Sequence, residues 1–153
     1  MNFAQILFLV GITIAAGYAG IWFRRAELSG LELWLPIGLI ISYAINPLVG
    51  FAVAFSIMII TWTLQPYGLH HLAISAAFMG GAFYFAPILF PVAEKTFLLN
   101  SMLVAVIFQA VANGFYIVTG YPLIRIARFV AVNLLLCWII FSKIGWQLVV
   151  WLK

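Results

Sequence analysis

The run from Phe97 to Thr119 constrains the fold of this chain most, because it is long enough to cross a bilayer and still carries polar side chains. Ser101, Gln109 and Asn113 recur at multiples of four residues, which on a helix stacks them on one face with Tyr116 close by. Lipid would not tolerate such a line, since an unpaired polar group is costly in hydrocarbon. We therefore expect this face to point into a bundle of further helices.

The composition indicates that the chain lies in a membrane rather than in water. Of the 153 residues, 67% are hydrophobic and 7% are charged, and the mean hydropathy is +1.24. A soluble domain would need far more charge to cover its surface. We predict an all-α, polytopic integral membrane bundle that forms a single domain over residues 1–153. The first apolar run has no Lys or Arg before Arg24, so we expect a retained helix rather than a signal peptide.

A hydrocarbon core about 30 Å thick needs about 20 apolar residues per helix, and this length divides the chain into six spans, with five as the alternative. The expected spans are 3–23, 31–45, 48–64, 72–90, 97–119 and 124–142. Ser142–Gly145 interrupts the last apolar run, so we expect that span to end near Ser142. Residues 144–153 would then lie along the interface, where tryptophan and lysine are favoured.

Two local patterns set the boundaries of the second and third spans. Ser29 and Glu32 have the spacing of a capping box, which predicts a helix that starts near Gly30. Asn46-Pro47 divides the following apolar run, because a residue before proline is biased away from helical geometry. We predict two helices here, and the alternative is one long kinked helix.

The fourth span carries the clearest helix-packing surface of the chain. Ala73, Ala77 and Gly81 recur every four residues, and such small residues let another helix approach closely, from this chain or from a partner. Pro87 and Pro91 are expected to close this helix. The face is therefore a candidate for contact with a partner or with lipid.

The basic residues indicate an orientation. With six spans, four arginines lie on one side and three lysines on the other. They are Arg24, Arg25, Arg125 and Arg128, against Lys95, Lys143 and Lys153. We expect the arginine-bearing loops on the cytoplasmic side of a plasma membrane and both termini outside. The arginines either anchor this topology or contact lipid phosphate or a protein partner. The net charge of +4 is spread along the chain, which argues against nucleic acid.

Side chains that carry chemistry at mid-depth are missing. The chain has no aspartate, and its three glutamates lie in or beside loops; they are Glu27, Glu32 and Glu94. Cys137 is the single cysteine, so no intrachain disulfide can form. His70 and His71 diverge by about 100° on a helix and are poorly placed to share a metal. We interpret both as interfacial loop residues, with ligation of a haem or chlorophyll shared with another chain as the alternative. We expect no enzyme activity, cofactor or metal.

Four polar residues of the last two spans form the candidate pocket: Gln109, Asn113, Tyr116 and Asn133. Buried amides need partners, so these groups are expected to converge. They either hydrogen-bond to each other and hold helices together, line a site for a small neutral or aromatic solute, or contact another subunit.

Six compact spans with little extramembrane mass, together with the segment Asn46-Pro47-Leu48-Val49-Gly50-Phe51, resemble the substrate-capturing subunits of energy-coupling factor transporters and the related MreD cell-shape proteins. Our first hypothesis is a non-catalytic small subunit of a larger membrane complex or homo-oligomer. The alternative is a solute-binding or transport subunit with a polar pocket between the last two helices.

Overall fold

The computed structural model describes the chain except Ser29, Gln65 and Tyr67, so the predicted capping box at Ser29 lies outside the described residues. The helices are α1 (Phe3–Arg25), α2 (Trp34–Ala44), α3 (Pro47–Leu64), α4 (Leu69–Leu89), α5 (Phe97–Val118), α6 (Leu123–Ile140) and α7 (Trp146–Leu152), and the π-helical turn η1 (Phe141–Gly145) joins the last two. Five stretches are long and apolar enough to cross a membrane, and α2 is a shorter apolar helix. The predicted all-α membrane bundle is confirmed.

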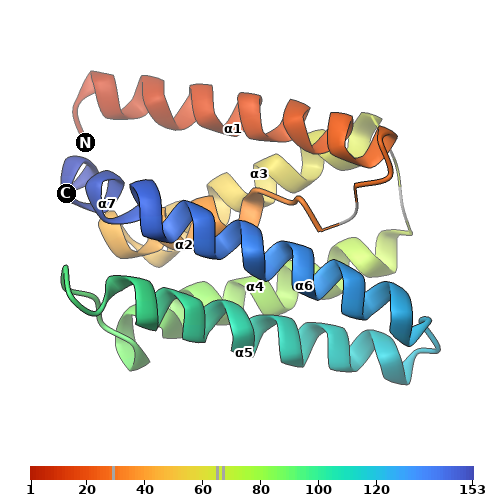
Figure 1. Ribbon diagram of the computed structural model, residues 1–153. Helices are drawn as coiled ribbons and strands as arrows, with labels where there is room; N and C mark the ends of the chain where they lie inside the picture. Colours follow the sequence, from red (N-terminus) through yellow and green to blue (C-terminus); the bar gives the residue numbers. More distant parts are fainter. Residues whose placement is uncertain (29, 65, 67) are drawn as a thin grey trace.

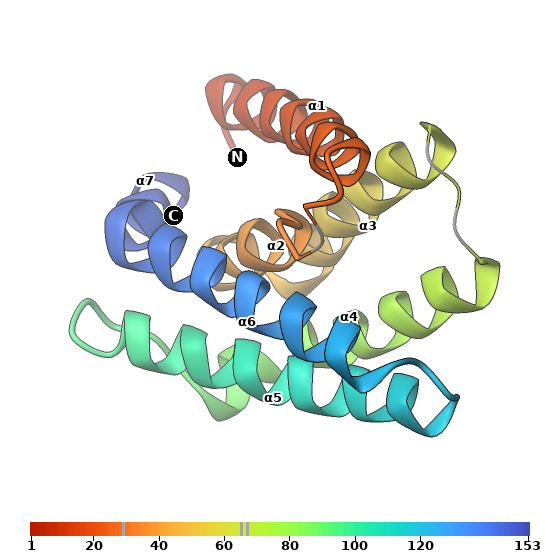
Figure 2. The same cartoon turned by 45° about the vertical axis from the view of Figure 1, so that its right-hand side comes forward.

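The helices run back and forth, and both termini lie at the same end of the bundle (Figure 1). Helix α1 packs along α3 on one side, whereas α4 and α5 pair on the opposite side and α6 lies against α5 (Figure 2). The end of α1 and the start of α6 both lie at the end far from the termini (Figure 1), so the four arginines share one end of the bundle, as the six-span prediction expects. That this end is cytoplasmic, in a plasma membrane, stays a prediction.

The centre of the bundle is α2, and all eleven of its residues are buried. A helix of this length measures about 16 Å, about half of the hydrocarbon thickness. Residues 30–33, which we call the inward segment, are non-helical and lead into the start of α2 (Figure 1). The predicted helix over 31–45 with a start near Gly30 is therefore wrong, because α2 begins only at Trp34.

Contacts with α6 keep the inward segment out of a helix. Gly30 has a φ of 98°, and a Cβ there would lie 2.6 Å from the carbonyl oxygen of Phe129. The Nδ2 of Asn133 donates to the carbonyls of Gly30 and Glu32, at 3.0 and 3.3 Å. Non-helical backbone at membrane depth is tolerated where protein groups pair with its polar atoms, as they do here.

The predicted division at Asn46-Pro47 is confirmed. The side-chain oxygen of Asn46 accepts from the Val49 N–H at 2.9 Å and caps α3, and Pro47 is the first helical residue. The alternative of one kinked helix is excluded. At the other proline site, α4 ends at Leu89, between the two prolines expected to close it, so Pro87 lies in the last turn of α4 and Pro91 follows its end.

The interruption expected at Ser142–Gly145 is a π-helical turn, η1, rather than a break in the helix, and the end of the membrane span stays a prediction. The chain continues through η1 into α7, so residues 123–152 form one helical stretch. Gly145 lies against the ring of Phe97, where a Cβ would be 2.5 Å from Cε1. In α7, Val149 and Leu152 are buried, and the Gln5 side chain donates to the carbonyl of Leu152 at 3.3 Å. The C-terminal segment thus packs into the bundle.

The small residues of α1 pack against α3, whereas the predicted small-residue row of α4, formed by Ala73, Ala77 and Gly81, does not pack closely inside the chain. In α1, Gly17 and Gly20 are buried, and the hydroxyl of Thr61 in α3 donates to the Gly17 carbonyl at 3.2 Å. On α4, Ala73 and Ala77 are exposed, and a Cβ at Gly81 would meet nothing within 4 Å. The buried residues of α4 are Leu72, Met79, Phe83 and Ala86. The predicted small-residue face therefore points out of the bundle.

Candidate functional site

The three amides of α5 and α6 converge in the interior, as the polar line of α5 predicts. Gln109, Asn113 and Asn133 are 1%, 8% and 0% exposed. The Nε2 of Gln109 donates to Oδ1 of Asn133 at 2.5 Å, and the Nδ2 of Asn113 donates to Oε1 of Gln109 at 2.6 Å. The polar face of α5 therefore looks into protein.

This amide network, formed by Gln109, Asn113 and Asn133, holds three parts of the chain together. Asn133 accepts from Gln109 and donates to the inward segment, so its amide oxygen and nitrogen both have protein partners. Gln109 likewise uses both of its side-chain atoms. The geometry favours the helix-joining interpretation for Gln109 and Asn133, and a ligand-binding role for them stays a prediction.

A polar chamber of about 720 Å³ opens at the arginine end of the bundle. Its walls come from the end of α1, the inward segment, α3, α4, α5, the turn after α5, and α6. Five residues singled out in the sequence line it together: Arg24, Asn113, Tyr116, Arg125 and Arg128. Asn113 belongs to both the amide network and the chamber, so the network forms part of the chamber's inner boundary. Arg25 is at the same end but does not line the chamber.

The sequence interpretation missed polar lining residues from other elements: Glu27, Glu32, His71, Ser75 and Tyr121. The Tyr116 hydroxyl donates to the carbonyl of His71 at 3.0 Å and lies 3.1 Å from the hydroxyl of Ser75. His71 and Ser75 are four residues apart on α4, the same spacing that marks the polar face of α5. This repeat is the signal that would have found them. His71 belongs to α4 rather than to the preceding loop, which corrects that expectation.

Three rings form an aromatic wall, defined as His71, Tyr116 and Tyr121. Their centroids lie 5.2 Å apart for His71 and Tyr116, 5.1 Å for His71 and Tyr121, and 5.8 Å for the two tyrosines. Rings at these separations pack against one another and present both apolar faces and polar atoms. The aromatic wall can therefore contact a ring or an apolar group while the Tyr116 hydroxyl remains hydrogen-bonded.

The charges of the chamber are only partly paired. The Nη2 of Arg24 donates to Oε1 of Glu32 at 2.7 Å, and the indole N–H of Trp34 donates to the other carboxylate oxygen at 2.6 Å. Arg125 and Arg128 are exposed, and no ion pair joins either to a residue that the structure describes. The arrangement offers positive charge and hydrogen-bond donors to a solute.

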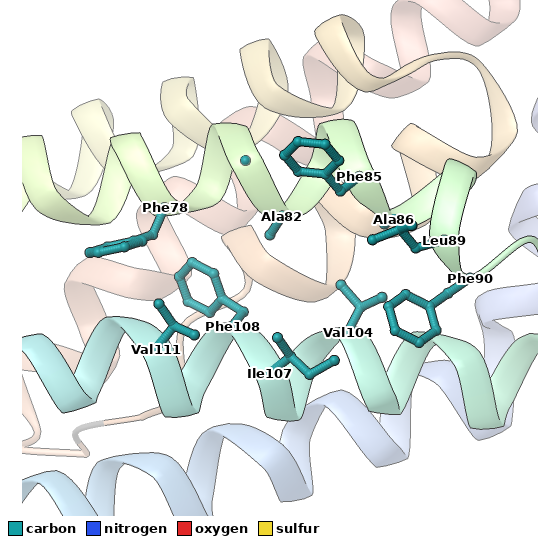
Figure 3. Close-up of a pocket in the computed structure, with 11 residues that line it drawn as sticks. Phe78, Ala82, Phe85, Ala86, Leu89, Phe90, Val104, Ile107, Phe108 and Val111 are labelled. Atoms are coloured by element: carbon teal, nitrogen blue, oxygen red, sulfur yellow. The ribbon is translucent and has the colours of Figure 1, made fainter.

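A second hollow, of about 320 Å³, lies between α4 and α5 and is lined by apolar side chains and small residues. Phe108 of α5 points toward α4, and Phe78 and Ala82 lie on the facing side (Figure 3). Gly81 also lines this hollow, which we call the apolar groove. Its chemistry suits hydrocarbon, from an acyl chain or from side chains of another helix.

No protein-family model, curated protein or solved structure matches the chain. Positive charge, a ring cluster and one amide of the network, Asn113, line the same space.

Proposed function

We propose that the protein is a non-catalytic membrane protein that binds a small solute in the polar chamber, as a solute-binding or transport subunit. The observation that carries the proposal is the convergence of Asn113, Tyr116, Arg125 and Arg128 on one space of about 720 Å³. These residues come from two helices and were singled out separately in the sequence.

The size and lining of the chamber support binding. Small-molecule sites commonly occupy about 300–1,000 Å³ and combine apolar walls with a few placed polar groups. Met58, Ile126 and Phe129 supply apolar surface beside the aromatic wall. The chamber also lies between helices of a bundle, where such sites are common.

Native mass spectrometry of the intact protein extracted in mild detergent tests this function. We expect a co-purifying small molecule that is lost in Asn113→Leu and reduced in Tyr116→Phe, because both side chains line the chamber. Thr63→Val is the control, since Thr63 is exposed on α3 outside the chamber. A bound molecule that survives both chamber variants unchanged contradicts the proposal.

A second candidate function is assembly as a subunit of a larger membrane complex, and the outward face of α4 favours it. Ala73 and Ala77 are exposed, and Gly81 has open space where a side chain would be and borders the apolar groove. Small residues allow close approach of helices in membranes, where packing rather than the hydrophobic effect drives association.

Cross-linking and co-purification test assembly. Ala77→Leu should release the partner subunit or dissociate the oligomer, because the larger side chain keeps the backbones apart. Ala127→Leu places the same change on an exposed position of α6 and should leave the assembly intact. A stable monomer with no co-purifying protein counts against this function.

A further inference from the structure

We propose that the solute of the polar chamber is an organic anion, with a phosphate or carboxylate held by Arg125 and Arg128 and an aromatic or apolar body held against the aromatic wall. The inference rests on the proposed solute-binding function and names its ligand class. The sequence offered a small neutral or aromatic solute as one alternative. The inference keeps the aromatic body and replaces the neutral charge, because the amides that suggested a neutral solute largely bind each other.

The balance of unpaired charge in the chamber is positive. Three arginines and two glutamates line it. Arg24 and Glu32 neutralise each other at 2.7 Å, and both side chains are partly buried. Two arginines and Glu27 remain, none of them in an ion pair with a described residue, which leaves an excess of one positive charge. An anion is the ligand that compensates this excess.

The position of the two arginines strengthens the preference for an anion. They are three residues apart in the first turns of α6, so their side chains share a face. The helix N-terminus adds positive potential, and no acidic residue in the first turn of α6 offsets it. Guanidinium groups present paired N–H donors that match the oxygens of phosphate and carboxylate.

The walls beside the arginines favour a ligand with a ring or another apolar group. The hydroxyl of Tyr116 is tied to His71 and Ser75, so the ring is held in place by two contacts. Ile126 and Phe129, on the same helix as the arginines, extend the apolar surface. A bare inorganic anion would contact the arginines but leave this surface unused.

Equilibrium binding to the intact protein in phosphatidylcholine nanodiscs tests the ligand class. The probes are phenyl phosphate and benzoate as aromatic anions, inorganic phosphate as an anion without a body, and phenol as a ring without charge. At least one aromatic anion should bind saturably, about ten-fold or more tightly than inorganic phosphate or phenol. Its affinity should fall with rising salt, since the arginines are exposed.

Charge variants separate the chamber from the surface around it. The double variant Arg125→Gln with Arg128→Gln should weaken binding of the aromatic anion about ten-fold or more. Arg25→Gln, at the same membrane end but outside the chamber, should leave the affinity unchanged. An equal loss in Arg25→Gln shows general surface attraction and overturns the inference.

Two further outcomes distinguish failure of the inference from failure of the function. Phenol that binds as tightly as the aromatic anions, and is lost in Tyr116→Phe but not in the arginine variants, overturns the anion and leaves solute binding standing. Failure of all four probes to bind saturably, with no co-purifying molecule, overturns both. Nanodiscs with added phosphatidylglycerol identify the source of the anion. Competition between this lipid and the probe indicates a lipid headgroup, whereas a lack of competition indicates a free solute. Both results support the anion chemistry.

Discussion

Two regions of the molecule differ in how they use polar and small residues. One is the half of the bundle around α2, which we call the closed half, and the other is the arginine end, which we call the open end. Every residue of α2 is buried, and Gly38 and Gly50 bring α2 against α4 and α3 with no room for a side chain. At the arginine end, Arg125 and Arg128 remain exposed beside an open chamber. The closed half uses its residues for packing, whereas the open end leaves charge available.

The amide network separates these two regions and shows why they differ. Gln109 and Asn133 lie inside and use their amides on protein groups, while Asn113 reaches both the network and the chamber. A polar group within the bundle is costly unless it is paired, whereas a group at the open end can be paired by water or a ligand. Substitutions should therefore change stability in the closed half and binding at the open end.

The largest effect is expected for Gly50→Ala in the closed half. A Cβ at Gly50 would collide with the Ser42 hydroxyl and lie 2.5 Å from the carbonyl oxygen of Gly38, and backbone cannot move aside easily. We expect a loss of about 3 kcal/mol in the free energy of unfolding, measured by denaturation in detergent micelles. Gly81→Ala is the matched control and should be stabilising by up to about 1 kcal/mol, because its site is open. An equal change in the free energy of unfolding for the two variants would show that Gly50 is no more tightly packed than Gly81.

Asn133→Leu should have the next largest effect. It removes the bond from Gln109 and the two bonds to the inward segment. Hydrogen bonds within membrane proteins contribute about 0.6 kcal/mol each on average, so we expect a loss of about 2 kcal/mol. The double variant with Gln109→Leu should lose less than the sum of the two single variants, since neither amide is then left alone. Strict additivity would show that the two amides are not coupled.

Glu32→Gln should have a smaller effect, because this carboxylate lies where the two regions meet. Its side chain is 18% exposed and accepts from Arg24 and from Trp34. We expect a loss of about 1 kcal/mol that shrinks at high salt, measured by the same denaturation. Glu94→Gln, exposed at the opposite end, should leave stability unchanged. A larger loss in Glu94→Gln would contradict the assigned pairing.

The smallest change in stability is expected for Arg125→Gln with Arg128→Gln. Both side chains are exposed and unpaired with described residues, so unfolding should shift by less than about 0.5 kcal/mol while anion binding weakens. Denaturation without added ligand measures this. A loss comparable to that of Asn133→Leu would mean that the arginines support the fold, and the contrast between closed half and open end would fail.

Much of the fold was predictable because its signals are local. Apolar runs of the right length gave five long helices, and Asn46-Pro47 marked the division between α2 and α3. The period of polar residues on α5 predicted a face that looks inward, and Gln109 and Asn113 are buried. The start expected near Gly30 came from a local pattern that contacts with α6 overrule, and the apolar run expected to be interrupted at Ser142 continues as helix through η1.

The candidate site was predictable only in part. Asn113, Tyr116 and the arginines of α6 stood out as polar residues in or beside apolar runs, and all of them line the chamber. Glu32 and Ser75 did not stand out, because a capping pattern explained one and a single hydroxyl on a helix is ordinary. Their role depends on Arg24 and Tyr116, which other elements bring to them.

The sequence alone determined the membrane environment, the helical class and the inward face of α5. Composition and the spacing of polar residues can be read within a single span, so no distant contact is needed for these predictions. Tertiary structure decided where α2 begins, how the last helix continues and which charges share a chamber. The bond from Asn133 to the Gly30 carbonyl joins residues 103 positions apart, and no local pattern contains both partners. Buried backbone carbonyls must find donors wherever the fold places them, so the inward segment takes its form from α6.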